Sequence, residues 1–310
     1  MSDKPVIGFI GVGLMGHGMA GSILRGGYPL VVKGNRNRDP VEDLLSKGAT
    51  EAATPAEMAA QCDMIHLCLS NSPQVEAVFR GPDGILAGAR EGLIVLDATT
   101  ADPTSTRALA AELAGKGGAM VDAPLGRTPK EAEEGTLDAM IGCDADTFKK
   151  ILPVVECWAG NINHVGETGS AHQMKLIMNF ISMGYAALYA EAVTLGASVG
   201  LAPQMIEQVI GTSRLGNGFF DTFMKYAVGR DRDAHKFAIA NASKDVRYAA
   251  NMASDAGVAN IMGASIKHYF TLAEGAGKGQ DYVPMLADFV AQMNGMDLAE
   301  IVAKHAKPKA

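Results

Sequence analysis

The sequence predicts an α/β domain followed by an all-α domain, with one long helix joining them. In the first half, short apolar runs alternate with helical segments of about ten residues, which is typical of βαβ units around a parallel sheet. From about Gly166 onward no segment has a convincing strand pattern. The length of 310 residues suits about two domains. We therefore predict domains at residues 1–166 and 167–310.

The elements of the first half follow from apolar runs and helix-start signals. Val6–Ile10 is a short apolar run, and Pro103 precedes the helical pattern that starts at Thr104. In chain order, the predicted strands are Val6–Ile10, Leu30–Val32, Met64–Leu69, Leu93–Leu96, Met120–Val121 and Ala139–Ile141, and the predicted helices are Met15–Leu24, Pro40–Ser46 and Thr104–Ala114.

The second half shows helical patterns separated by glycine and proline. The first of them is long and joins the two domains. The predicted helices are Ala171–Val199, Pro203–Thr212, Phe219–Ala227, Ala240–Ala256, Ile261–Ala273 and Tyr282–Met293.

Composition excludes several classes of function. The net charge is −7 and no cluster of lysines and arginines offsets it, so nucleic acid is not expected as a partner. No apolar run reaches about 18 residues without a charge, because Glu191 interrupts Leu176–Val199, and no membrane span is expected. The N-terminus lacks signal-peptide features, and the four scattered cysteines form no metal-binding pattern, which predicts a cytoplasmic protein with reduced thiols and no metal.

A glycine motif at the first predicted turn indicates dinucleotide binding. Gly11, Gly13 and Gly16 form a GxGxxG between a predicted strand and a predicted helix, as in Rossmann-type domains. Gly11 would permit the tight turn, Gly13 would let the backbone approach a pyrophosphate, and Gly16 would let helix and strand pack closely. The free N–H groups of the helix N-terminus would bind the phosphates.

The residues after the second predicted strand bear on the choice of cofactor. An acidic residue there would bind the ribose hydroxyl of NAD, but this sequence has Gly34-Asn35-Arg36. Arg36 could pair with the 2′-phosphate of NADP, whereas a solvated loop arginine is the alternative. We expect NADP, with NAD as the second choice, and Asn35 and Arg36 as cofactor contacts.

Several motifs together resemble the β-hydroxyacid dehydrogenase family, and they occur in the family's order through nearly the whole chain. They are the glycine motif followed by Met19-Ala20, then Asp122-Ala123-Pro124, Gly135-Thr136-Leu137, Lys175 and Lys244-Asp245. The resemblance implies a Rossmann-type domain, a connecting helix and a helical domain that forms homodimers or homotetramers. It also implies that Leu14, Met15, Leu69, Ser70, Thr100 and Lys244 contact the cofactor, and that Lys175 and Asn179 are catalytic, with Asn179 also binding the substrate.

The sequence departs from the family pattern at three places. One is an extra residue in the cofactor loop before Gly48, so either Gly34 or Asn35 takes the position that selects between NAD and NADP. The first asparagine of K-x-x-N-N is replaced by Met178. Where most of the family has Ser-Gly-Gly, this chain has Gly126-Arg127-Thr128, which is similar to sulfolactaldehyde reductases, whose arginine helps to hold the sulfonate. These three residues are therefore predicted to bind the substrate.

The chemistry of Lys175 and Arg127 suits this function. A lysine can donate a proton to the oxygen of a reduced aldehyde and stabilise its charge, and Lys175 and Asn179 share one helix face. A guanidinium can bind a carboxylate or sulfonate through two hydrogen bonds. The alternatives are a surface lysine, and a loop arginine paired with Glu131 or Glu134.

We therefore predict an oxidoreductase of class EC 1.1.1 that interconverts a small 3-hydroxy acid, or a sulfonate analogue, and its semialdehyde. The partner is a small acidic aldehyde or hydroxy acid. The alternatives are sulfolactaldehyde reductase specifically, a cofactor-binding module without catalysis, and an imine reductase. Lys175 argues against the last two, because non-catalytic relatives typically lose this lysine and imine reductases usually have Asp or Tyr there.

Overall fold

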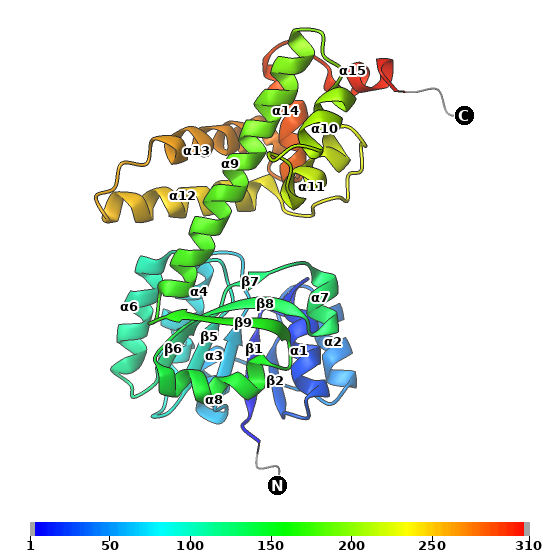
Figure 1. Cartoon of the computed structure of the whole chain (residues 1–310). Helices are drawn as coiled ribbons and strands as arrows, with labels where there is room; N and C mark the ends of the chain where they lie inside the picture. Colours follow the sequence, from blue (N-terminus) through cyan, green and yellow to red (C-terminus); the bar gives the residue numbers. More distant parts are fainter. Residues whose placement is uncertain (1–3, 307–310) are drawn as a thin grey trace. The chain divides into compact units, whose positions relative to one another are not determined.

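A computed structural model of the chain describes residues 4–306. The chain divides into two compact units, with the division between Lys175 and Leu176. All extended strands of residues 4–306 lie in the first unit, and the second unit is helical (Figure 1). The predicted fold, an α/β domain followed by an all-α domain, is confirmed.

The first unit is built on one sheet with the strand order of a Rossmann fold. The order is β3-β2-β1-β4-β5-β6-β8-β7, and β9 pairs with β8. The strands from β3 to β6 are parallel, β8 runs antiparallel to β6 and β7, and β9 is parallel to β8. The strands are β1 (Ile7–Ile10), β2 (Leu30–Lys33), β3 (Thr50–Glu51), β4 (Met64–Leu67), β5 (Ile94–Asp97), β6 (Ala119–Asp122), β7 (Leu125–Gly126), β8 (Leu137–Gly142) and β9 (Ala159–Gly166).

Apolar residues alternate between two cores, one on each face of the sheet. Ile7 and Phe9 belong to one buried cluster, whereas Ile10 and Ile65 belong to the other. Strands buried on both faces read as continuous apolar runs, which explains why the sequence revealed β1, β4 and β5. The helices of this unit are α1 (Gly16–Arg25), α2 (Asp39–Ser46), α3 (Pro55–Gln61), α4 (Ser72–Arg80), α5 (Ile85–Gly88), α6 (Pro103–Ala114), α7 (Pro129–Glu134) and α8 (Ala145–Val155).

In the first unit, the sequence analysis missed the strands β3, β7 and β9 and the helices α3, α4, α5, α7 and α8. β9 is mostly exposed and contains polar residues, so it lacks the apolar run that marks a central strand. The missed helices α3, α4 and α8 begin at side-chain caps, Thr54, Asn71 and Asp144, which accept hydrogen bonds from the first backbone N–H groups.

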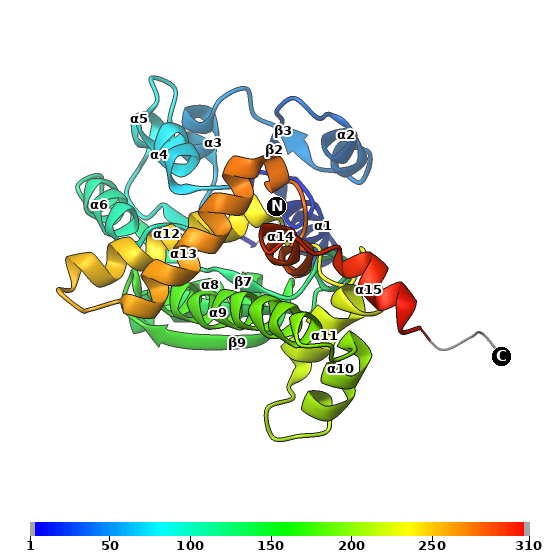
Figure 2. The ribbon, with the colours of Figure 1, turned by 90° about the horizontal axis from the view of Figure 1, so that it is seen from above.

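The second unit is a set of helices around its own core. The long helix α9 (Ser170–Ser198) begins in the first unit, which ends at Lys175, and its remaining residues belong to the second. Figure 2 shows it as one continuous helix. Buried Met183, Ala190, Phe223 and Phe270 belong to the core of the second unit. Its other helices are α10 (Pro203–Gly211), α11 (Gly218–Ala227), α12 (Ile239–Asp255), α13 (Ile261–Ala273), the π-helix η1 (Glu274–Lys278), the 3-10 helix η2 (Val283–Met285), α14 (Leu286–Met293) and α15 (Leu298–Lys304).

Helix α9 is, by length and composition alone, apolar enough to cross a membrane. One such helix is weak evidence for a membrane span, because core helices of soluble proteins can have the same length and apolar composition. Several residues of α9, including Met183, Ala186 and Val193, are buried in the core of the second unit.

Candidate functional site

The glycine loop lies at the end of β1 and has the geometry that the sequence predicted. Gly11 has a φ of +98°, and a side chain there would collide with the carbonyl oxygen of Cys68 at the end of β4. A side chain at Gly16 would collide with the carbonyl oxygen of Gly11. A Cβ on Gly13, in contrast, would meet nothing within 4 Å among the described residues. The loop is therefore closed toward the sheet and open at Gly13, where a phosphate could approach the backbone.

The loops after β1 and β4 flank the position where the strand order reverses. β1 pairs with β2 on one side and with β4 on the other, and ligands of such sheets bind at this crevice. Leu14 of the glycine loop is 83% exposed, which is unusual for a leucine and fits a residue that a bound molecule would cover. Met15 is half-buried and packs against the core.

The loop after β4 is held by the loop after β5. The backbone N–H of Leu69 donates to Thr99 Oγ1 over 3.0 Å, and the N–H of Thr99 donates to the Asp97 carboxylate over 2.9 Å. Burial raises the pKa of Asp97, which is fully enclosed at the end of β5. Leu69, Ser70 and Thr100, the predicted cofactor contacts, are thus carried on two mutually braced loops.

The loop after β2 carries two arginines with different partners. Arg38 pairs with Glu42 and with Glu51, at 2.7 Å each, and its hydrogen bonds hold the pKa of Glu51 below its usual range. Arg36 is exposed and forms no hydrogen bond or ion pair within residues 4–306, and Asn35 beside it is also exposed. Arg36 therefore has a guanidinium available to a ligand, whereas Arg38 neutralises the nearby acidic residues.

Lys175 lies beside the loop that contains Arg127. Its Nζ donates to the carbonyl oxygen of Leu125 over 2.6 Å, and the side chain is half-buried. Leu125 immediately precedes Gly126 and Arg127. Within the first unit, the predicted catalytic lysine and two of the predicted substrate-binding residues are therefore brought together from positions about 50 residues apart.

Arg127 has a left-handed backbone, with a φ of +77°, which non-glycine residues rarely adopt. Its Nε lies 3.0 Å from Asp138 Oδ2, and this ion pair is partly exposed, at 48% for Arg127 and 35% for Asp138. The expected alternative partners are occupied elsewhere, since Glu131 accepts from Thr128 in a capping box and Glu134 pairs with Lys130. The alternative of a pairing with Glu131 or Glu134 is therefore wrong, and the partner is Asp138 on β8.

Thr128 is the N-cap of α7. Its side chain accepts from the third backbone N–H of the helix, and its hydroxyl donates to the Glu131 carboxylate. This hydrogen bond gives the hydroxyl a structural role besides the predicted role in substrate binding.

In the second unit, Asn179 and Lys244 meet at one carboxylate. Asn179 Nδ2 donates to Asp245 Oδ2 over 2.7 Å, and Lys244 Nζ lies 3.2 Å from Asp245 Oδ1. The Lys244 ammonium also lies 5.6 Å from the centroid of the Tyr248 ring. Asp245 thus orients both predicted site residues of this unit.

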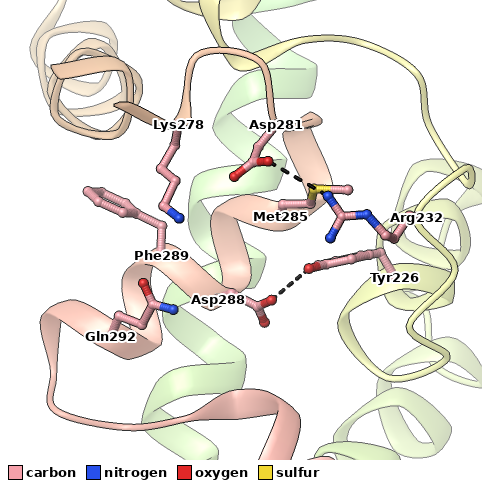
Figure 3. Close-up of a pocket in the computed structure, with 8 residues that line it drawn as sticks. All are labelled: Tyr226, Arg232, Lys278, Asp281, Met285, Asp288, Phe289 and Gln292. Carbon is pink, nitrogen blue, oxygen red and sulfur yellow. Dashed lines mark hydrogen bonds and ion pairs between the residues drawn. The ribbon is translucent and has the colours of Figure 1, made fainter. Parts of the chain in front are cut away.

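A pocket of about 320 Å³ also lies in the second unit, between α11, the loop after η1 and α14 (Figure 3). Its acidic groups are paired: Asp288 accepts from Tyr226 over 2.6 Å, and Asp281 lies 3.8 Å from Arg232. None of the predicted site residues lines this pocket. The residues around it are Tyr226, Arg232, Lys278, Asp281, Met285, Asp288, Phe289 and Gln292.

Sequence reasoning missed the bracing hydrogen bonds of Thr99 and the pairing of Asp138 with Arg127. Thr99 lies in the loop after β5, at the edge of the sheet where ligands of parallel sheets bind, and this signal could have marked it. Asp138 carried no such signal, because only the pairing of Gly126 with Asp138 brings it beside Arg127.

Two family models together match most of the chain. The model for the NAD binding domain of 6-phosphogluconate dehydrogenase matches residues 6–166. The model for the NAD-binding region of NADP-dependent 3-hydroxyisobutyrate dehydrogenase matches residues 169–288.

Individual relatives are similar over almost their whole length. The chain is 33% identical to 3-sulfolactaldehyde reductase of Escherichia coli, over 90% of this chain and 94% of that protein. It is 31% identical to 2-(hydroxymethyl)glutarate dehydrogenase of Eubacterium barkeri, over 96% and 99%. A solved structure of 3-hydroxyisobutyrate dehydrogenase from Salmonella typhimurium has a TM-score of 0.79 at 25% identity, over 92% of this chain and 100% of that chain.

Proposed function

The chain belongs to the β-hydroxyacid dehydrogenase family, and we propose from this premise that it interconverts a small 3-hydroxy acid, or a sulfonate analogue, with its semialdehyde. It is an NAD(P)-dependent oxidoreductase of class EC 1.1.1. The observation that carries the proposal is the hydrogen bond between Lys175 Nζ and the Leu125 carbonyl, because it sets a half-buried ammonium beside the Gly126-Arg127 turn.

The first unit fits a nicotinamide dinucleotide. Gly13 leaves its backbone open, and the N-terminus of α1 follows directly, so free N–H groups face the place where a pyrophosphate would lie. Exposed Leu14 and the two braced loops, which carry Leu69, Ser70 and Thr100, would contact the rest of the cofactor. When bound, the nicotinamide supplies or accepts the hydride.

Lys175 is proposed as the general acid and base. Reduction of an aldehyde leaves negative charge on its oxygen, and the Lys175 ammonium would stabilise this charge and donate the proton. In the oxidation direction, the neutral amine would take the proton of the hydroxyl. Asn179 follows one helical turn later on α9 and would hydrogen-bond the substrate.

Arg127 is proposed as the anchor for the acidic end of the substrate. Asp138 pairs with Nε, so the two Nη groups are the part of the guanidinium that would bind an oxyanion. Gly126 and Thr128 would complete this substrate loop. A sulfonate can accept the same two hydrogen bonds from the guanidinium. Sulfolactaldehyde reductase is therefore the specific second candidate, supported by the Gly-Arg-Thr sequence and by the relative of that name.

NADP is the proposed cofactor, with NAD as the alternative. Arg36 is an exposed cation of the loop after β2 and forms no ion pair within residues 4–306, and Arg38 offsets the charge of Glu42 and Glu51. Together these groups leave positive charge where a 2′-phosphate would lie. Lys244 of the second unit would contact the cofactor as well.

The domains proposed from the sequence are a dinucleotide-binding domain at residues 1–166 and a substrate and oligomerisation domain at residues 167–310.

The exposed apolar side chains of α9, including Ile177, Met178, Ile181 and Leu188, support a homodimer or homotetramer. The free thiols of all four cysteines support a cytoplasmic location. We propose no nucleic-acid or membrane partner. Light scattering of the purified protein tests the oligomeric state.

The function is tested with a panel of short aldehydes that carry a carboxylate, a sulfonate or no charge. Each is assayed by the absorbance of NADPH and of NADH at one pH, and the corresponding hydroxy compounds are assayed in the oxidation direction. We expect turnover of acidic three- or four-carbon aldehydes with a preference for NADPH. Turnover of imines alone would support an imine reductase, and cofactor binding without any turnover would support a non-catalytic module.

A further inference from the structure

Asp122, at the carboxyl end of β6, holds the beginning of helix α9. Its carboxylate is fully buried and accepts two backbone hydrogen bonds, from Gly169 N over 2.6 Å and from His172 N over 2.8 Å. Gly169 immediately precedes α9, and His172 lies in its first turn. Asp122 therefore caps α9 from a strand distant in sequence, whereas an N-cap side chain usually belongs to the residue directly before the helix.

Two further contacts fix the same turn. Thr168 Oγ1 donates to the carbonyl oxygen of Met120 over 2.9 Å. Thr106 Oγ1 lies 3.1 Å from the Asp102 carbonyl and 2.8 Å from His172 Nδ1. The Thr106 hydroxyl thus links the His172 ring to the beginning of α6.

The geometry points to a second function for Asp122: we propose that it is a positioning residue for Lys175. Lys175 follows His172 by three residues, about 4.5 Å along the helix axis. Leu125, whose carbonyl accepts from Lys175, follows Asp122 by three residues on the other side. Asp122 and Leu125 on one segment are hydrogen-bonded to His172 and Lys175 on the other, so the two segments form a closed frame. Its two cross-links are the bond from His172 N to Asp122 and the bond from Lys175 Nζ to the Leu125 carbonyl.

The strand side of the frame is itself rigid. Ala123 N donates to the Asp97 carbonyl over 2.8 Å, and Leu125 pairs with Ala139 in the sheet. Gly142 lies directly opposite Asp122, and a Cβ there would lie 2.8 Å from the Asp122 carboxyl carbon. The sheet therefore leaves room for this carboxylate only because residue 142 is glycine.

A carboxylate is required because both of its oxygens accept. In Asp122→Asn, the amide retains one accepting oxygen, and its NH₂ group must face the N–H of either Gly169 or His172. The first turn of α9 would then shift away from β6 and carry Lys175 with it. Displacements of about 1 Å at a reacting group can lower turnover by about 10²-fold.

The test rests on the proposed role of Lys175 and uses a double-mutant cycle in the full-length protein. The variants are Asp122→Asn, Lys175→Ala and the pair, assayed with NADPH and the best aldehyde acid of the panel. We expect Asp122→Asn to lower kcat by about 10-fold to 100-fold with little change in KM for NADPH. We expect it to cause no further loss in the Lys175→Ala background, because its effect on turnover passes through that ammonium.

Asp144→Asn is the matched control. Asp144 caps α8 in the same unit with hydrogen bonds from Asp146 N over 3.0 Å and Thr147 N over 2.9 Å, and α8 carries no predicted site residue. It should lower thermal stability and leave kcat unchanged. Thr168→Val removes only the hydrogen bond from Thr168 to the Met120 carbonyl and so loosens the same turn of α9. This variant replaces Asp122→Asn in the cycle if Asp122→Asn does not fold.

The outcomes separate this proposal from the proposed function. If Lys175→Ala retains near-normal turnover, the role of Lys175 is wrong. If Lys175→Ala loses most of its turnover but Asp122→Asn leaves kcat unchanged, or lowers it equally in both backgrounds, positioning by Asp122 is overturned. Where Asp122→Asn does not fold, the same two results with Thr168→Val overturn it.

Discussion

Replacing Arg127 by glycine separates the cost of its backbone conformation from its use in binding. Arg127 and Arg230 are the non-glycine residues with positive φ in residues 4–306. A left-handed conformation costs an L-residue about 1–2 kcal/mol, and glycine avoids this cost. Such an unfavourable residue is retained where the surrounding structure or function requires its side chain.

The expected change in stability is small because opposing terms cancel. Glycine relieves about 1–2 kcal/mol of strain but loses about 0.5–1 kcal/mol more backbone entropy on folding. The partly exposed ion pair with Asp138 contributes about 0–1 kcal/mol. Arg127→Gly should therefore be about as stable as the wild type, whereas Arg127→Ala keeps the strain and should be less stable than Arg127→Gly by about 1 kcal/mol.

The assay measures kcat/KM for an acidic aldehyde and for a neutral aldehyde of the same length. In both variants we expect the acidic-to-neutral ratio to fall by about 10-fold or more, equivalent to about 1.4 kcal/mol or above. Arg127→Lys should recover only part of the loss, because an ammonium lacks the planar fork. Thermal denaturation supplies the stability comparison.

The result that refutes the reasoning is an unchanged ratio in both variants. Arg127 would then serve only its ion pair with Asp138, and the acid-anchor proposal would be wrong. Arg127→Ala proving more stable than Arg127→Gly would instead contradict the left-handed conformation.

Three other predictions concern catalysis, cofactor choice and acid stability. Lys175→Ala should still bind NADPH but lose about 10²-fold or more in turnover, and near-normal turnover would contradict a proton-transfer role. Arg36→Ala should weaken NADPH more than NADH by roughly 1–3 kcal/mol, measured by titration of both cofactors, and equal effects would exclude a 2′-phosphate contact. Burial lowers the pKa of His66 to about 3, so the unfolded state binds the extra proton and stability falls as pH drops below about 6.5. At pH 5 the loss of unfolding free energy amounts to about 2 kcal/mol. His66→Phe keeps an aromatic ring against Phe9 and should abolish this loss. If the variant unfolds with the wild-type pH profile, His66 is not the group responsible.

The glycine loop and the long helix could be predicted because their signals are local. The strand before Gly11, the spacing of the glycines and the helix after them occupy one short segment, and the geometry of each glycine follows from its neighbours. Helix α9 was predicted within one residue at each end, since its apolar pattern is continuous. The edge strand β9 was missed because an exposed strand has no apolar run to mark it.

The surroundings of the candidate site depend on contacts between distant segments. Asp138 becomes the partner of Arg127 because the antiparallel register of β7 and β8 sets Gly126 opposite Asp138, and a register one residue different would turn that side chain to the other face. Asp122 reaches the first turn of α9 across about 50 residues of sequence.

The sequence by itself determined the central strands, the long helix α9 and the glycine loop, because these depend on local propensity and on continuous apolar patterns. It also marked Lys175 and Arg127 as candidate site residues, because of the chemistry of their side chains. The tertiary structure decided which arginine of the loop after β2 is paired within residues 4–306, which carboxylate pairs with Arg127, and where the Lys175 ammonium is held. These depend on sheet register and on buried hydrogen bonds between segments far apart in the chain, and no local pattern encodes such pairings.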